Sequence, residues 1–318
     1  MDTPAGPYFG KSYDWDQDHG ALLVNPKGLT KTALALKPGD KPHTWTATYG
    51  SLTFNQVARE LPLAGINEAG LTVEIMVVGS QDPLPDQRFT VNELQWIQLQ
   101  LDQYATVREV MENVESIRIS RIQARVHYLI CEESGVCGVV EVLNGKFVHP
   151  WGEDLPVRAL ANHPYQDSLT YIKKFTGFGG DGKIPATTYS LDRFARAASL
   201  AASFDPATEI AESKAFSILE AVKQEHSQWN VVYHLKAREV AYRNVGESAI
   251  RRVSLKDLDF SCRKKIFGRD FRSDGKFIPF TSAMNRELLE KTTSLHPLPG
   301  DALNQILSYP DSDSVKCP

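Results

Sequence analysis

Four polar residues in this sequence could support acid–base or amide chemistry: Lys11, Asp14, Asn162 and Arg193. Each falls at the end of an expected strand or the start of an expected helix, where a rigid backbone can aim a side chain. Lys11 and Asp14 belong to the aromatic-rich stretch Tyr8–Trp15, which is typical of a strand. Residues three apart on an unbroken strand point to opposite faces, so these two side chains converge only if the strand ends or bulges near Ser12 and Tyr13.

Each of the four residues also has an ordinary interpretation. Lys11 would suit an exposed strand face, Asp14 and Asn162 would suit turns, and Arg193 would suit a helix surface with an ion-pair partner. Without a family resemblance, the sequence therefore indicates an α+β protein that is an enzyme, and it does not indicate the reaction.

Motifs for other kinds of chemistry are missing from the sequence. There is no Gly-X-Ser-X-Gly elbow and no dinucleotide-binding glycine fingerprint, and the glycine loop Gly177–Lys183 lacks the spacing of a phosphate loop. The cysteines and histidines show neither Cys-X-X-Cys nor His-Glu-X-X-His spacing. We therefore expect no cofactor and no metal.

The elements expected to position these residues follow the order strands, helices, strands, helices, strands. Residues 8–80 are typical of an antiparallel meander, in which the alternating segment His43–Phe54 predicts one half-buried strand. Helical spacing predicts a helix over Asn92–Tyr104, and Ser190 is expected to cap a helix over Leu191–Phe204 that carries Arg193. Strict strand–helix alternation is lacking, so we expect an α+β fold with helices packed on antiparallel sheets.

The composition excludes several classes of protein. Hydrophobic residues make up 42% and charged residues 23% of the chain, which is typical of a globular protein with a full core. The net charge of −4 argues against a nucleic-acid partner. No apolar run approaches the roughly 18 residues of a membrane span, and residues 1–6 do not resemble a secretory signal. We expect a single domain over residues 1–318 with a polar, partly mobile tail after about residue 293.

The four cysteines are too few for a disulfide scaffold in a chain of this length. Cys131 and Cys137 flank a short loop that could place them opposite each other on a hairpin, where a cross-strand disulfide is geometrically conceivable. We expect free buried thiols instead.

Several segments resemble the choloylglycine hydrolase and penicillin V acylase family. Tyr8–Trp15 is similar to the family's opening Tyr-Phe-Gly-Arg-Asn-Leu-Asp-Trp strand, and Gly65–Leu71 resembles its Gly-Met-Asn-Glu-X-Gly-Leu turn. Leu160–Pro164 resembles its Leu-Thr-Asn-X-Pro segment, and Ser190–Arg196 resembles Ser-X-Ser-Arg-Phe-X-Arg. Gln228–His234 is similar to a late strand of the linear amide C–N hydrolases. The matches occur in the family's order and span about residues 1–260.

The resemblance implies an N-terminal-nucleophile hydrolase with four αββα layers, two antiparallel sheets between helices. In that family the leading Cys of the mature chain attacks the amide carbonyl, and its own α-amino group acts as the base, with a pKa of about 7.7–8.0 that suits neutral pH. Carried over, Asp14 would hold that amine and Asn162 would donate a hydrogen bond to the oxyanion. Arg193 would orient the site, with Lys11 as the strand cation. The implied substrates are acyl amides, namely bile-salt conjugates, penicillin V or acyl-homoserine lactones, and the implied assembly is a homo-oligomer, a dimer or tetramer.

Three departures from the family pattern affect this interpretation. Lys11 replaces an Arg and so loses the planar fork of hydrogen-bond donors. A second side-chain oxyanion donor falls near Met76 or Val77, neither of which can donate from its side chain. The family Cys stands further before the strand cation than the ten residues that precede Lys11, so we expect the 318 residues to lack the nucleophile and to be inactive.

Two interpretations remain open: an amide hydrolase given with a short or truncated start, or a non-catalytic ligand-binding homologue of the same fold. Localisation stays undetermined, cytoplasmic for the sequence as printed and periplasmic or secreted if a signal lies upstream.

Overall fold

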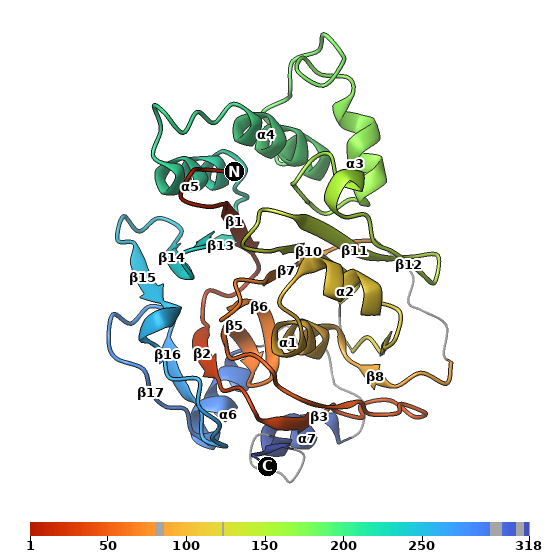
Figure 1. Ribbon diagram of the computed structural model, residues 1–318, viewed down its shortest axis with the longest axis vertical. Coiled ribbons are helices and arrows are strands. Elements are labelled where there is room, and N and C mark those ends of the chain that lie inside the picture. The colour runs from red at the N-terminus through yellow and green to blue at the C-terminus, as the bar shows by residue number, and fades with distance from the viewer. Residues whose placement is uncertain (80–85, 123, 293–300, 310–314, 318) are drawn as a thin grey trace.

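The computed structural model describes residues 1–79, 86–122, 124–292, 301–309 and 315–317. Two antiparallel sheets pack against each other, and helices cover their outer sides (Figure 1). This arrangement confirms the expected α+β fold with αββα layers. In the described part of the chain, no helix is both long and apolar enough to cross a membrane.

The smaller sheet has four strands in the order β1-β13-β14-β15 and carries β1 at its edge. Its strands are β1 (Tyr8–Asp14), β13 (Ser227–His234), β14 (Glu239–Asn244) and β15 (Arg251–Ser254). Three helices lie on its outer side, at the top of Figure 1: α3 (Tyr165–Ile172), α4 (Ser190–Ala202) and α5 (Ala211–Ala221). Helix α5 packs directly on β1 and β13 and so covers the outer face of the opening strand.

The larger sheet has nine strands in the order β12-β11-β10-β7-β6-β5-β2-β16-β17. Its central strands are β2 (Ala21–Asn25), β5 (Ser51–Ala58), β6 (Leu61–Asn67), β7 (Thr72–Val77), β10 (Val126–Cys131) and β11 (Cys137–Leu143). Shorter strands complete it: β12 (Lys146–Val148), β16 (Phe267–Asp270) and β17 (Ile278–Pro279). Helix α1 (Glu93–Gln103) packs on β6 and β7, α2 (Val107–Asn113) packs on β11, and α6 (Ser282–Lys291) packs on β5.

The remaining elements are short and lie outside the two main sheets. They are β3 (Thr30–Thr32), β4 (Thr44–Thr46), β8 (Thr90–Val91), β9 (Arg118–Ile119), the 3₁₀ turns Gly152–Asp154 and Leu255–Asp257, α7 (Ala302–Ser308) and β18 (Val315–Lys316). Strands β3, β4 and β18 form one small sheet, and β8 pairs with β9.

Aromatic side chains join the two sheets. Phe54 of β5 meets the rings of Tyr233 and Tyr242 edge-on, with centroids 6.2 and 5.9 Å apart. Trp229 and Tyr242 also pack against Phe271, and all five of these rings are buried. Each ring buries a large apolar area, so this cluster fixes the spacing between the sheets.

The segment His43–Phe54 does not form the single strand predicted from its alternation. It contains β4, a turn and the start of β5. The chain turns at Gly50, where a Cβ atom would lie 2.3 Å from Phe260, while the backbone amides of Thr48 and Tyr49 donate to the carbonyl of Asp102. These contacts come from distant segments, so they override the local alternation.

All four cysteines form disulfides, which corrects the expectation of free thiols. Cys131 pairs with Cys137 across the β10–β11 hairpin, where the two residues stand directly opposite each other. Cys262 pairs with Cys317 and so fixes the described end of the chain. The tail after about residue 293 was expected to be partly mobile. Residues 293–300, 310–314 and 318 of this tail lie outside the described residues. Its described part contains α7 and β18.

Candidate active site

Asp14 is the last residue of β1, and its carboxylate accepts hydrogen bonds from three side chains. Gln224 Nε2 lies 2.6 Å from Oδ2, Ser12 Oγ lies 3.2 Å from Oδ1, and Ser227 Oγ also donates to Oδ1. The pairing register with β13 shifts between Tyr13 and Asp14, at the point where the sequence required β1 to end or bulge. The carboxylate is therefore held in one orientation at the end of the strand.

Arg193 connects Asp14 to Asn162. Its Nη1 atom lies 3.8 Å from Asp14 Oδ2, and its Nη2 atom donates to Asn162 Oδ1 at 2.6 Å. Nε donates to the backbone oxygen of Thr188 at 3.0 Å, so the guanidinium is fixed on three sides. The side chain is buried, and this burial lowers the pKa of the guanidinium, an effect that the nearby Asp14 carboxylate opposes. Three of the four predicted residues therefore meet at one point.

Asn162 is fixed at both its side chain and its backbone. Its Nδ2 atom donates to the carbonyl of Val77 at 2.9 Å, which leaves a second hydrogen on Nδ2 for another acceptor. Its backbone amide donates to Ser190 Oγ at 2.7 Å. Ser190 was expected to cap α4, but Tyr189 occupies the cap position and makes no side-chain cap. The Ser190 hydroxyl holds the Asn162 loop instead.

Lys11 lies on the same cavity but contacts different partners. Its Nζ atom donates to the carbonyl of Ser12 at 2.5 Å, and burial lowers the pKa of its ammonium group, while Glu74 and Asp14 oppose that shift. Glu74 projects from β7 and is only 2% exposed, and its Oε1 atom accepts a hydrogen bond from Tyr233 Oη at 2.7 Å. Burial raises the pKa of Glu74 to about 7. The site thus contains a second carboxyl group, whose charge changes near neutral pH.

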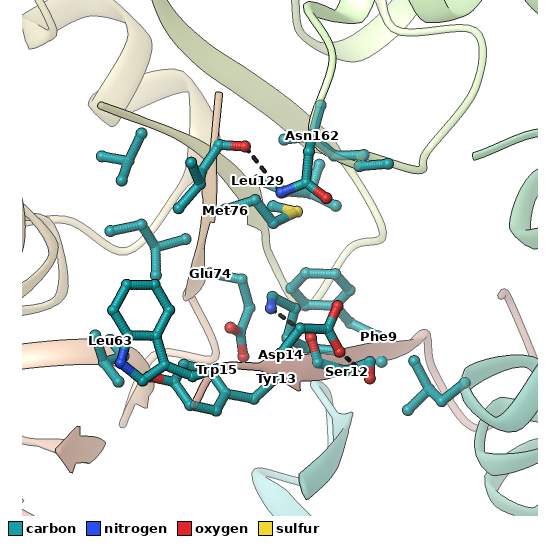
Figure 2. Close-up of a pocket in the computed structure, with 18 of the residues that line it drawn as sticks. Phe9, Ser12, Tyr13, Asp14, Trp15, Leu63, Glu74, Met76, Leu129 and Asn162 are labelled. Atoms are coloured by element: carbon teal, nitrogen blue, oxygen red, sulfur yellow. Dashed lines mark hydrogen bonds between the residues drawn. The ribbon is translucent and has the colours of Figure 1, made fainter. Parts of the chain in front are cut away.

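One cavity of about 280 Å³ connects these groups. Figure 2 shows Asn162 on one wall of the cavity and Asp14, with Ser12 and Tyr13, on another. Apolar side chains supply most of the remaining lining, among them Phe9, Leu63, Met76, Leu129, Leu160, Ile218 and Leu219. Such a cavity can exclude water from an apolar group while a few polar atoms fix its orientation.

Neither a metal site nor a free thiol occurs among the described residues. No cluster of three His, Cys, Asp or Glu side chains in this part of the chain could hold a metal ion. The four cysteines are all disulfide-bonded.

Glu74 and Ser190 are site residues that sequence reasoning did not assign to the site. A signal for Glu74 was available, because it is a lone carboxylate in the otherwise apolar run Val73–Val78 of a predicted strand. Ser190 offered no such signal, because its partner lies 28 residues away in sequence.

A model of the linear amide C–N hydrolases, choloylglycine hydrolase family, matches residues 2–268. The chain belongs to this family. Among curated proteins, the penicillin V acylase of Pectobacterium atrosepticum is 25% identical to this choloylglycine hydrolase family member over 215 residues. That match covers 61% of the chain and 56% of the acylase, so the chain spans only about half the length of this curated relative.

Solved structures of the family share the fold. The penicillin V acylase of Agrobacterium tumefaciens has a TM-score of 0.72 at 23% identity, covering 84% of this chain and 89% of that one. A variant of the conjugated bile acid hydrolase of Clostridium perfringens has a TM-score of 0.67 at 16% identity, covering 88% and 96%. At these identities the likeness concerns the fold of this family member and not its substrate.

Proposed function

We propose that the protein hydrolyses the linear amide bond of acyl amides, such as conjugated bile salts, penicillin V or acyl-homoserine lactones. The observation that carries the proposal is the Arg193 guanidinium, which joins Asp14 to Asn162 on the wall of an apolar cavity. The acyl group would occupy the apolar part of the cavity and the amide carbonyl would face Asn162. The names of the relatives, penicillin V acylase and conjugated bile acid hydrolase, support the same class of substrate.

The reaction needs a thiol beside Asp14. The thiol proton passes to the α-amino group of the same residue, and the sulfur attacks the amide carbonyl. The oxyanion that forms accepts a hydrogen bond from Asn162 Nδ2, the C–N bond breaks as the amine takes up the proton, and water then cleaves the thioester. Asp14 would hold the α-ammonium group, and Arg193 would fix the positions of the Asp14 and Asn162 side chains relative to each other. Lys11 supplies positive charge on the same cavity.

The backbone of β1 suggests where such a residue would lie. The Met1 amine donates to the carbonyl of Tyr8, and the Tyr8 amide donates to the carbonyl of Met1, both at 2.8 Å. These two bonds begin an antiparallel pairing on the open edge of β1. Asp14 lies six residues beyond Tyr8, so the same pairing continued backwards puts the sixth residue before Met1 opposite Asp14. We propose that a Cys at this position is the nucleophile, and that the printed 318 residues alone bind acyl amides without cleaving them.

The test compares three proteins on a panel of the acyl amides named above. The first is the printed chain, the second carries a six-residue strand-forming extension that begins with a processed, free-amine Cys, and the third carries the same extension with Ala in place of that Cys. We expect hydrolysis from the Cys extension alone. Asp14→Asn in the active protein should lower kcat by at least about 100-fold, because the α-amino group loses its charged partner.

A second outcome is equally informative. If the Cys extension binds acyl amides by calorimetry but leaves every one of them intact, the amidase assignment is wrong, and the protein is a ligand-binding member of the family. The apolar cavity favours this alternative over any function that lacks a ligand.

A further inference from the structure

Two buried side chains, which contact each other, bind the backbone on either side of Asn162. His127 of β10 and Glu141 of β11 are 0% and 1% exposed, and His127 Nδ1 lies 2.7 Å from Glu141 Oε1. Polar side chains are costly to bury, because they lose their hydration. The contacts of these two residues with the backbone indicate why the pair is useful at this position.

The pair holds both ends of the five-residue loop Ala161–Tyr165. At the start of the loop, His127 Nε2 lies 2.6 Å from the carbonyl oxygen of Ala161. At its end, both Glu141 oxygens accept from the backbone amide of Tyr165, at 3.0 and 3.2 Å. Tyr165 is the first residue of α3, so the carboxylate also satisfies a free amide at a helix start.

The contact with Ala161 acts on Asn162 through a single peptide unit. The Ala161 carbonyl and the Asn162 amide belong to the same planar group, and the amide end donates to Ser190 Oγ. His127 therefore fixes one end of this plane and Ser190 fixes the other. Both ring nitrogens of His127 face acceptors, Glu141 and Ala161, so the ring donates through both when it carries two protons.

We propose that His127 and Glu141 are positioning residues that set the orientation of the Asn162 amide relative to the reacting carbonyl. They do not touch the cavity, and they act through the backbone on either side of Asn162. The proposal rests on the proposed amide hydrolysis. It predicts that changes in the pair reduce turnover and leave substrate binding intact, because an oxyanion donor acts on charge that develops in the transition state.

The first test uses the Cys-extended protein. Glu141→Gln and His127→Phe should each lower kcat at least tenfold, with KM within about twofold of the parent, since a small misplacement of a catalytic donor is costly. His127→Gln should recover part of kcat, because its amide can still donate to the Ala161 carbonyl. Trp45→Phe is the matched control: it removes the 2.7 Å bond from Nε1 to the buried Asp102 carboxylate, which is made outside the Ala161–Tyr165 loop, and it should leave kcat unchanged.

The second test does not depend on activity. In the printed chain labelled with ¹⁵N-asparagine, Asn162→Asp identifies the side-chain amide signal of Asn162. Glu141→Gln should move that signal, and Trp45→Phe should leave it in place. If Glu141→Gln changes neither this signal nor kcat, the positioning role is wrong. If the extended protein never cleaves an amide, the proposed function fails, and the Asn162 signal alone decides the role of the pair.

Discussion

Glu74 places a group in the cavity that can change its charge near neutral pH. Burial raises its pKa from 4.5 to about 7, and Lys11 and Tyr233 oppose the shift. Lys11 comes from β1, Tyr233 from β13 and Glu74 from β7, so this cluster spans the gap between the two sheets. When Glu74 is protonated, Lys11 loses one of its two nearby negative partners and keeps Asp14, and the cavity becomes more positive.

We predict that Glu74 makes the folded state less stable as pH rises. The folded pKa lies above the unfolded value, so the folded state holds the proton more tightly. Its stabilising contribution is present in full below about pH 4.5 and is lost as pH rises to about 7. Glu74→Gln removes this dependence. The free energy of unfolding of the variant, relative to that of the parent, should therefore rise by up to about 3 kcal/mol between pH 4.5 and pH 8. Urea denaturation at several pH values measures the difference.

Exposed Glu153 supplies the control for this experiment. Glu153→Gln should give a stability curve parallel to that of the parent. Parallel curves for Glu74→Gln as well would contradict the assignment of a raised pKa.

At the scale of elements, strand β1 positions the candidate site, because it carries Lys11 and Asp14 and lies at the edge of its sheet. Tyr8 bonds to Met1 on the open side, so the alternation of an antiparallel strand turns the backbone groups of Gly10 and Ser12 to the same side. Lys11 already donates to the carbonyl of Ser12 there. An edge of this kind is a template for one further strand.

We predict that the six-residue extension raises the melting temperature whether it begins with Cys or with Ala. Each added backbone hydrogen bond contributes about 0.5–1.5 kcal/mol. The thiol of the added Cys does not contribute to this gain, so stability and the proposed activity should separate between the two versions. Thermal unfolding followed by circular dichroism measures it.

A proline placed two residues before Met1, opposite Gly10, is the control, because proline has no amide hydrogen to donate. This version should lose much of the gain. An unchanged melting temperature for every extension would mean that β1 does not pair with residues before Met1.

At the scale of the whole molecule, two disulfides hold segments of very different length. Cys131–Cys137 closes a hairpin, and its sequence separation is 6. Cys262–Cys317 closes a long segment, and its sequence separation is 55. The longer link fixes the chain end beside β3, which pairs with β18. Ile306 of α7 also lines the cavity that contains Asp14 and Asn162, so this part of the chain helps to form that cavity.

We predict that the longer disulfide contributes more to stability. Loop-closure entropy gives about 4 kcal/mol for the longer link and about 2 kcal/mol for the shorter one. The double variant Cys262→Ala with Cys317→Ala should therefore unfold at lower urea concentration than Cys131→Ala with Cys137→Ala. Equal losses, or a greater loss for the hairpin pair, would show that packing at the cysteines outweighs chain entropy.

The sequence by itself determined the elements whose signals are local. Helix α1 lies within the expected range Asn92–Tyr104, with Asn92 as its cap, and Thr106 caps α2. Asn144-Gly145 forms the tight turn between β11 and β12 with positive φ at both residues. The motifs around Lys11, Asp14, Asn162 and Arg193 also indicated the family. These features depend on neighbours within a few residues, so they can be inferred from spacing and propensity.

Only the tertiary structure decided how these pieces meet. Arg193 reaches Asp14 across 179 residues of sequence. Ser190 was expected to cap its own helix, but its hydroxyl accepts from the backbone amide of Asn162 instead. Phe260 occupies the space that a Cβ atom at position 50 would need, and Cys262 bonds to Cys317 across a sequence separation of 55. Each outcome depends on side chains packed from distant segments, where contact, burial and the pairing of buried polar groups outweigh local preference.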